Sequence, residues 1–305
     1  MKTESGKVLL LGAGDIGRRI IASITPQFAV TAVTSQRANR SSLKRLGAKA
    51  VSANLDRPHS LSRLPSDWQI LIHCAPPPAR GTRDSRTRNL LRSVALRGLE
   101  RSKILTRVII YLSTSGVYGD CGGAVVSEAR ALRPANPRAQ RRVDAERRLA
   151  RHAKRRGMHL IILRVPGIYA ADRLPLERLQ AGTPAIIAAE DSYTNHVHAA
   201  DLAALTVRAM RHALRRRPAL SRAYNANDDS DIRMGDYFDL VAQAFGLPAP
   251  PRLPRAAIAN AVSPMLFSFM RESRRLDNRR QKRELRLRFQ FPTVADGVSA
   301  IHSCA

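Results

Sequence analysis

Three glycines near the start of the chain, Gly12, Gly14 and Gly17, have the spacing of a dinucleotide-phosphate site. In such a site the first glycine allows a tight turn, the second lets backbone approach a pyrophosphate, and the third lets a helix pack closely on a strand. The apolar run at residues 8–11 predicts a strand buried on both faces. Isoleucines at helical spacing then predict a helix that begins near Asp15, whose free N–H groups would face phosphate. We expect the cofactor phosphates to lie on Gly12, Ala13, Gly14, Asp15, Ile16 and Gly17.

The end of the second predicted strand, residues 29–34, bears on the choice of cofactor. An NAD site usually places Asp or Glu there, to accept hydrogen bonds from the ribose 2′-hydroxyl. This chain has Ser35 and Arg37 instead, and these side chains would bind a 2′-phosphate that a carboxylate would repel. We therefore expect NAD(P) as the cofactor, with NADP preferred over NAD. The alternative, that Arg37 and Arg40 are ordinary solvated arginines, stays open.

Strands and helices alternate through the first two thirds of the chain. After the predicted third strand, Asn54 and Leu55 would lie near the adenine, and after the fourth, Ala75 and Pro76 begin a stiff proline loop. Strands are predicted over 48–51, 68–74, 106–112, 159–164 and 223–226, and helices over 42–46, 82–100, 136–156, 202–214 and 234–245. Residues 248–254 are rich in proline and predict a linker or a wrapped segment.

This alternation of strands and helices predicts an α/β fold, a Rossmann-type doubly wound parallel sheet with a small C-terminal substrate lobe. We expect residues 1–169 to form the NAD(P)-binding domain, with residues 196–226 returning to it. Residues 170–195 and 227–305 would then form the smaller lobe on the substrate side.

The composition restricts the partners and the compartment. The 305 residues include 52 Lys and Arg against 24 Asp and Glu, a net charge of +28, and the arginines are spread along the whole chain. Aromatic residues make up only 5%, and no nucleic-acid module is recognisable, so we expect at most nonspecific nucleic-acid contact. No apolar run is long enough to span a bilayer, and the first residues lack an apolar signal stretch. We expect a cytoplasmic protein without a membrane partner.

Metal binding is not favoured. The cysteines Cys74, Cys121 and Cys304 show neither ligand spacing nor a disulfide framework. His196 and His198 lack companions at ligand spacing, and the acidic cluster at residues 228–231 predicts a solvated loop. We therefore expect no metal site.

Five segments, in the same order along the chain, resemble the extended short-chain dehydrogenase/reductase superfamily and its NAD-dependent epimerase/dehydratase family. They are residues 113–119, 128–134, 163–169, 196–203 and 277–292. The glycine motif, the proline loop and residues 224–247 look most like the atypical branch that includes bacterial YeeZ-like proteins. The resemblance implies an NAD(P)-binding oxidoreductase or epimerase-like protein that acts on a carbonyl or sugar-derived anionic substrate. It also implies that Pro166 and Ile168 close over the nicotinamide.

The chain departs from this family at the catalytic pair, Tyr-x-x-x-Lys, which falls at Arg138 and Arg142. A guanidinium stays protonated near neutral pH and cannot shuttle a proton. Arg142 could still hold the ribose hydroxyls as a donor. Thr114 falls at the family's Ser/Thr position, where it would polarise a carbonyl, and Tyr118 and Tyr169 are the other phenols nearby in sequence.

Two classes of function therefore stay open. The first is an NAD(P)-dependent oxidoreductase or epimerase-like enzyme with Thr114 in the catalytic site and a small, anionic substrate. The second is a non-catalytic NAD(P)-binding sensor or scaffold, which the missing Tyr and Lys favour. A homodimer is considered in either case, and the sequence does not decide it.

Overall fold

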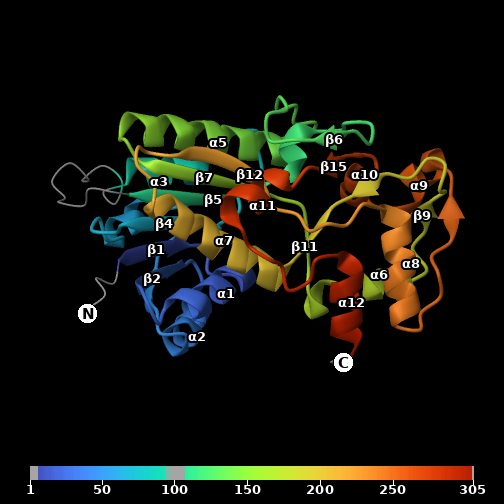
Figure 1. Cartoon of the computed structure of the whole chain (residues 1–305), viewed down its shortest axis with the longest axis horizontal. Helices are drawn as coiled ribbons and strands as arrows, with labels where there is room; N and C mark the ends of the chain where they lie inside the picture. Colours follow the sequence, from blue (N-terminus) through green and yellow to red (C-terminus); the bar gives the residue numbers. More distant parts are fainter. Residues whose placement is uncertain (1–5, 94–95, 97–106, 304–305) are drawn as a thin grey trace. The chain divides into compact units, whose positions relative to one another are not determined.

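The computed structural model describes residues 6–93, 96 and 107–303, and these form two compact units (Figure 1). The sheet unit comprises the described residues up to 117 together with residues 134–164 and 202–224. The C-terminal unit comprises residues 118–133, 165–201 and the described residues from 225 onward. The assignment of a cofactor domain and a substrate lobe stays a prediction about what these parts do.

The sheet unit is built on seven parallel strands, which confirms the predicted Rossmann-type fold. The strands are β1 (Lys7–Leu11), β2 (Ala29–Thr34), β3 (Lys49–Ser52), β4 (Ile70–His73), β5 (Val108–Thr114), β7 (His159–Val165) and β12 (Ser221–Asn225), in the order β12-β7-β5-β4-β1-β2-β3. After β3 the chain crosses back and adds β4 on the other side of β1. This switch point brings the carboxyl ends of β1 and β4 together, which is where open α/β sheets bind ligands.

The helices of this unit are α1 (Asp15–Ile24), α2 (Arg40–Arg45), α3 (Ser85–Arg92), α5 (Pro137–Arg155) and α7 (Ala199–Leu214), with short 3-10 turns η1 (Arg37–Asn39), η2 (Pro58–Arg63) and η4 (Ser115–Tyr118). Side-chain caps begin two of the helices: Asp84 accepts from the Thr87 N–H at the start of α3, and Asn136 accepts from the Ala139 N–H at the start of α5. Part of the predicted helix 82–100, and Thr106 of the predicted fifth strand, lie outside the described residues.

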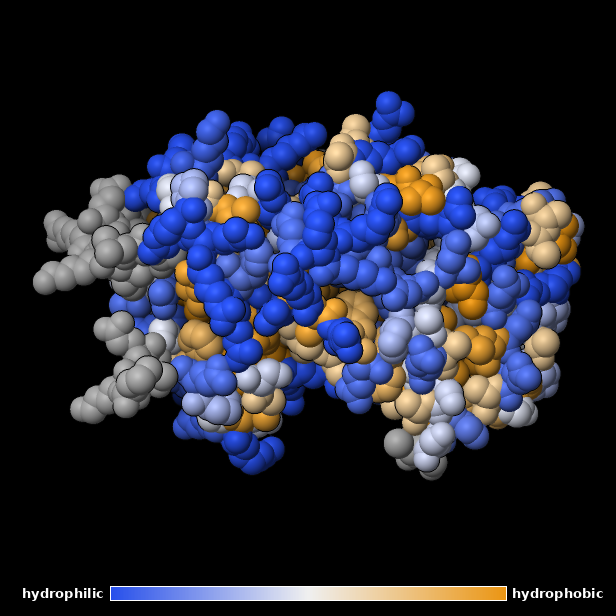
Figure 2. All heavy atoms as spheres, viewed as in Figure 1, coloured by the Kyte–Doolittle hydropathy of each residue, from blue (hydrophilic) through white to orange (hydrophobic). Residues whose placement is uncertain are grey.

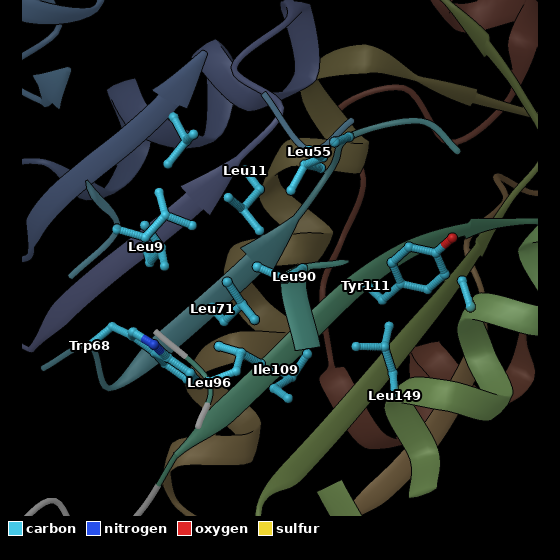
Figure 3. Close-up of a cluster of buried hydrophobic side chains, with 14 of the residues drawn as sticks. Leu9, Leu11, Leu55, Trp68, Leu71, Leu90, Leu96, Ile109, Tyr111 and Leu149 are labelled. Atoms are coloured by element: carbon cyan, nitrogen blue, oxygen red, sulfur yellow. The ribbon is translucent and has the colours of Figure 1, made fainter. Parts of the chain in front are cut away.

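One apolar core fills the space between the sheet and the helices on one of its faces (Figure 3). Leu9, Leu71 and Ile109 come from neighbouring strands and meet Leu90 of α3 and Leu149 of α5. All four residues of β4 and all seven of β7 are buried, as expected for strands covered on both faces. This core fixes the strand ends from which the candidate site is built.

The C-terminal unit contains pairs of very short strands and several short helices. The pairs are β6 (Val125–Val126) with β15 (Arg275–Leu276), β8 (Gly167–Tyr169) with β11 (His196–His198), β9 (Ala185–Ile186) with β14 (Arg252–Leu253), and β10 (Tyr193–Thr194) with β13 (Ile232–Arg233). The helices are α6 (Leu176–Gln180), α8 (Met234–Ala244), α9 (Arg255–Ala261), α10 (Pro264–Met270), α11 (Arg279–Leu285) and α12 (Val294–Ser303), with the 3-10 turn η5 (Ala171–Arg173). Because β14 lies in the proline-rich stretch, that stretch wraps against β9 and is not a free linker.

Within the described part of the chain, every helix is too short or too polar to cross a membrane.

Candidate functional site

The glycine turn between β1 and α1 has the geometry that its sequence predicts. Gly12 has a φ of 85°, and a Cβ on it would lie 2.4 Å from the backbone nitrogen of Ala75. A Cβ on Gly17 would lie 2.6 Å from the carbonyl oxygen of Gly12, whereas one on Gly14 would meet nothing within 4 Å. The first and third glycines are therefore required by packing inside the protein, while Gly14 faces open space.

A cavity of about 320 Å³ lies beside this turn, where the carboxyl ends of β1, β2, β3 and β4 meet. It is lined by Leu11, Gly12, Ala13, Gly14, Val33, Thr34, Ser35, Gln36, Asn39, Ala53, Asn54, Leu55, Ala75, Pro76 and Arg86. No side chain among the described residues caps the N-terminus of α1, so its first N–H groups remain available to a ligand. The lining residues include no Asp or Glu. This arrangement fits a dinucleotide diphosphate: an open backbone turn, a helix N-terminus and a wall without negative charge.

The structure brings together about half of the residues predicted to hold the cofactor. Eight of them line the cavity, namely Gly12, Ala13, Gly14, Ser35, Asn54, Leu55, Ala75 and Pro76. Asp15, Ile16 and Gly17 form the first turn of α1 instead, where Ile16 is buried in the core and the Asp15 carboxylate pairs with Arg19 at 2.9 Å. Arg37 is exposed in η1 and does not line the cavity.

The wall after β2 contains polar side chains that sequence reasoning missed. The Thr34 hydroxyl accepts a hydrogen bond from the Gln36 N–H at 3.2 Å and shapes the turn after the strand. Arg18 of α1 donates from Nη2 to Asn39 Oδ1 at 3.0 Å, which places a guanidinium beside this wall. Gln36 and Asn39 lie close in sequence to the predicted residues Ser35 and Arg37, after the same strand. This position at a strand end is the sequence signal that could have identified them.

Arg86 joins two loops that line the cavity, and no sequence pattern predicted this role. Its Nε and Nη2 donate to the two carboxylate oxygens of Asp56 at 2.8 and 2.6 Å, and its Nη1 donates to the carbonyl of Pro76 at 3.0 Å. The loop after β3 is thereby tied to the loop after β4. The same hydrogen bond lowers the pKa of Asp56 and raises the pKa of Arg86. We call this pair the Arg86–Asp56 clasp.

Thr114 and Arg142 lie at the carboxyl end of β5. Thr114 is half-buried, and its hydroxyl accepts a hydrogen bond from the Gly116 N–H at 3.3 Å, which leaves its proton available to donate. Arg142 of α5 donates from Nη1 to the Tyr111 hydroxyl at 3.1 Å and to the Leu112 carbonyl at 2.8 Å. Part of the Arg142 guanidinium is therefore engaged with β5 itself.

The ionisable groups beside Arg142 are poorly suited to proton transfer near neutral pH. Burial raises the pKa of Tyr111 to about 12 and lowers the pKa of His73 to about 3. The His73 Nε2 lies 3.1 Å from the Thr87 hydroxyl, which itself donates to Asp84, so His73 is the donor in that contact. Neither group replaces the missing tyrosine as an acid or base.

A buried polar network sets the position of α5 on the sheet. The Ser113 hydroxyl donates to Glu146 Oε1 at 2.5 Å, and Arg164 Nη2 donates to Glu146 Oε2 at 3.0 Å. All three side chains are buried and come from β5, α5 and β7. The network fixes the rotation of α5 and with it the places of Arg138 and Arg142. Partial desolvation, followed by the charges of Arg142 and Arg141, lowers the pKa of Arg138, although its side chain reaches the surface.

The comparisons with known proteins agree with this geometry. The model of the NAD dependent epimerase/dehydratase family matches residues 8–226, which is most of the chain. The chain belongs to this family. No curated protein matches it in sequence.

Solved structures share the fold of this chain over almost its full length. A functionally unknown conserved protein from Silicibacter pomeroyi is 26% identical, with a TM-score of 0.80 over 98% of this chain and 99% of that one. UDP-glucose 4-epimerases from Thermotoga maritima, solved with UDP-glucose, and Bifidobacterium longum, solved with NAD+ and UDP, are each 16% identical. Their TM-scores are 0.75 and 0.74 over 97% of each chain. At that identity the two epimerases show a common fold.

The remaining predicted residues lie in the C-terminal unit. Pro166 directly precedes β8, in which Ile168 pairs with Val197 of β11. The Tyr118 hydroxyl donates to Asn225 Oδ1 at 2.7 Å, and the Tyr169 hydroxyl donates to the Thr293 carbonyl at 3.2 Å. Both phenols are buried and hydrogen-bonded within the protein, and burial raises the pKa of Tyr169 further. Both therefore have structural roles.

One expectation about this unit is wrong for one of its residues. The acidic cluster was expected to be a solvated loop, but Asp228 is only 1% exposed, while Asp229 and Asp231 are exposed. Burial in the protein interior raises the pKa of Asp228 to about 7. Over the described residues, no group of three or more His, Cys, Asp or Glu side chains could hold a metal ion.

Proposed function

We propose that the chain binds NADP(H) in the cavity at the glycine turn. The observation that carries the proposal is the open backbone turn at Gly14, which stands in front of the uncapped N-terminus of α1. In this proposal the turn holds the diphosphate, and Asn54 and Leu55 hold the adenosine end. The solved complex of the Bifidobacterium longum epimerase with NAD+ and UDP supports a nicotinamide nucleotide for this fold.

The preference for NADP over NAD follows from charge at the end of β2. The cavity wall there consists of Thr34, Ser35, Gln36 and Asn39, with the Arg18 guanidinium bonded to Asn39. A ribose 2′-phosphate needs donors and positive charge, whereas a 2′-hydroxyl is usually bound by a carboxylate. Arg37 is exposed beside this wall and is free to turn toward a phosphate in our proposal.

We further propose an oxidoreductase or epimerase-like reaction on a carbonyl or sugar-derived anionic substrate in a reducing cytoplasm. When bound, the nicotinamide supplies a hydride donor or acceptor. Thr114 donates its hydroxyl proton as a hydrogen bond to the reacting oxygen. Arg138, exposed one helical turn before Arg142, attracts the anionic group of the substrate.

A second candidate is a protein that binds NAD(P) without turnover, as a sensor or scaffold. The specific observation in its favour is that Arg138 and Arg142 occupy the positions of the family's Tyr and Lys. Tyr111 and His73 do not replace them, because burial moves their pKa values far from neutrality. General acid–base catalysis typically contributes a factor of about 10² to 10⁴, so a chain without it would turn over slowly.

Titration calorimetry with NADPH, NADP, NADH and NAD tests the cofactor proposal. We expect saturable binding of all or some of these, with NADPH and NADP the tightest. Gly14→Asp places a carboxylate against the diphosphate and should weaken binding by more than about tenfold. Gly14→Ala is the matched control for side-chain bulk, since a Cβ there meets nothing within 4 Å. Equal affinity of Gly14→Asp and the wild type would refute the site.

A panel of carbonyl compounds then separates the two candidates. NADPH oxidation that depends on the carbonyl, and that falls when Thr114 is changed to Val, supports the enzyme. Tight NADPH binding with no oxidation across the panel supports the sensor or scaffold.

A further inference from the structure

A second cavity lies wholly within the C-terminal unit, beside the end of α11, and the proposed function does not use it. Its volume is about 490 Å³, a size typical of small-molecule sites. It is lined by Asp229, Gln281, Lys282, Arg286, Leu287, Arg288, Phe289 and Pro292. We call it the α11 cavity.

The charges of the α11 cavity are mostly positive and only partly neutralised. Asp229 is the one acidic residue that lines the cavity. Its Oδ1 already pairs with the Lys282 ammonium at 2.5 Å and accepts a hydrogen bond from the Asn278 amide at 2.7 Å. Arg286 and Arg288 are exposed and have no ion pair with any described residue. Two guanidiniums on one wall suit a phosphate, because each presents a fork of N–H donors to its oxygens.

The backbone at Arg286 is unusual. Arg286 is the residue that ends α11, and its φ of 49° and ψ of 42° lie in the left-handed region. Gly or Asn adopts this conformation most easily, so an arginine there is locally unfavourable. A cation at a helix C-terminus is favourable for the helix dipole, but that effect does not need a left-handed residue. The position instead puts the side chain of Arg286 on the cavity wall.

The rest of the wall is apolar or uncharged. Phe289 and Leu287 are half-buried, and Pro292 lies beside them on the same cavity. Gln281 is 3% exposed and held by a hydrogen bond from its Nε2 to the Asn227 carbonyl at 2.7 Å, so this part of the wall is fixed. A flat ring can pack on Phe289 while an attached phosphate meets the arginines.

We infer that the α11 cavity binds a small phosphorylated molecule that carries a planar ring, at a site separate from the glycine turn. Arg286 and Arg288 hold the phosphate, and Phe289 and Leu287 contact the ring.

AMP is the probe for this inference, with adenosine and inorganic phosphate as its two halves. Titrations use the Gly14→Asp chain at 150 mM salt, so that neither the glycine turn nor nonspecific attraction accounts for binding. We expect one AMP site on this chain, with adenosine and phosphate each binding much more weakly. Arg286→Asn with Arg288→Gln should lower AMP affinity by about tenfold or more. Asn suits the left-handed backbone, so this variant should fold.

Arg283→Gln is the matched control, because Arg283 is exposed on the same helix and does not line the cavity. Its AMP affinity should equal that of the parent chain. Absence of AMP binding to the Gly14→Asp chain, or equal losses in Arg283→Gln and the double variant, would overturn the inference. NADPH binding to the wild-type chain is measured in parallel, so failure here is distinct from failure of the proposed function.

Discussion

Asp228 is an acidic residue with almost no exposure to water. It lies in the C-terminal unit, where its Oδ1 accepts the Ser230 N–H at 2.9 Å. Burial, together with the nearby charges of Asp229 and Asp201, raises its pKa from 3.8 to about 7. Between these two values the folded chain holds a proton on Asp228 that the unfolded chain has lost. The free energy of unfolding therefore falls as pH rises through this range.

Asp228→Asn should remove this pH dependence, because an amide stays neutral. We expect the variant to gain stability relative to the wild type from about pH 4 to pH 7, by at most about 4 kcal/mol, and the difference to stay constant above pH 7. Urea denaturation at a series of pH values measures it. Asp231→Asn, at an exposed carboxylate of the same cluster, should give a curve parallel to that of the wild type. A parallel curve for Asp228→Asn as well would contradict the expectation.

Individual residues show how much of the candidate site could be predicted from the sequence. Gly12, Gly14 and Gly17 were predictable because their roles depend on local backbone geometry, which the motif encodes. Arg86 was not, since it reaches the cavity only after α3 has packed beside the loops of β3 and β4. Nor could the sequence show that Asp228 is buried while its neighbours Asp229 and Asp231 are exposed.

Among the elements, the loops after β3 and β4 form one side of the cofactor cavity, and the Arg86–Asp56 clasp is their direct link. Asn89 also holds the loop after β3, through a hydrogen bond to the Leu55 carbonyl at 2.9 Å, and Arg141 donates to the Gly81 carbonyl in the loop after β4. The clasp adds a link between the two loops and so limits how far they separate. Its contribution to global stability is small, under about 1 kcal/mol, because both side chains are partly exposed. Its main effect is on ligand binding, because it keeps the two loops ordered before the ligand binds.

Arg86→Ala should therefore weaken cofactor binding by about tenfold while the melting temperature changes little. Titration calorimetry with NADPH and thermal unfolding measure the two effects. Arg88→Ala is the control, because Arg88 is exposed on the same helix and does not line the cavity. A large fall in melting temperature without loss of affinity would show that the clasp serves folding instead.

The predicted elements of the sheet unit agree closely with the structure, and those of the C-terminal unit agree less well. Buried strands such as β4 and β7 are continuous apolar runs, and α1 and α5 carry clear helical periodicity, so pattern alone located them. The strands β6, β9, β10 and β13–β15 are two residues long, which is too short for any period. Their pairing depends on segments far apart in the chain.

At the scale of the whole molecule, positive charge dominates. The net charge is +28, and the surface in Figure 2 is largely hydrophilic. On α5 the exposed Arg147, Arg151 and Arg155 follow at spacings of four, and like charges at this spacing do not stabilise a helix. Such a surface attracts polyanions through counterion release, without reading their sequence.

We expect the chain to bind duplex DNA at 50 mM salt and to lose about 10³-fold or more of this affinity by 200 mM. Two duplexes of unrelated sequence should behave alike in fluorescence anisotropy. A sequence preference that persists at 200 mM salt would instead indicate a specific nucleic-acid function. NADPH titrations in the same buffers serve as the control, since a shaped cavity loses less affinity to salt.

The sheet unit is also discontinuous in sequence, and this has a consequence on the ribosome. β7 is buried along all seven residues, yet its outer neighbour β12 is not synthesised until residues 221–225. During the intervening elongation, a nascent chain would expose an apolar strand edge that another chain can join. We therefore expect chaperones to bind the nascent chain at this stage. Chains truncated between β7 and β12 should aggregate.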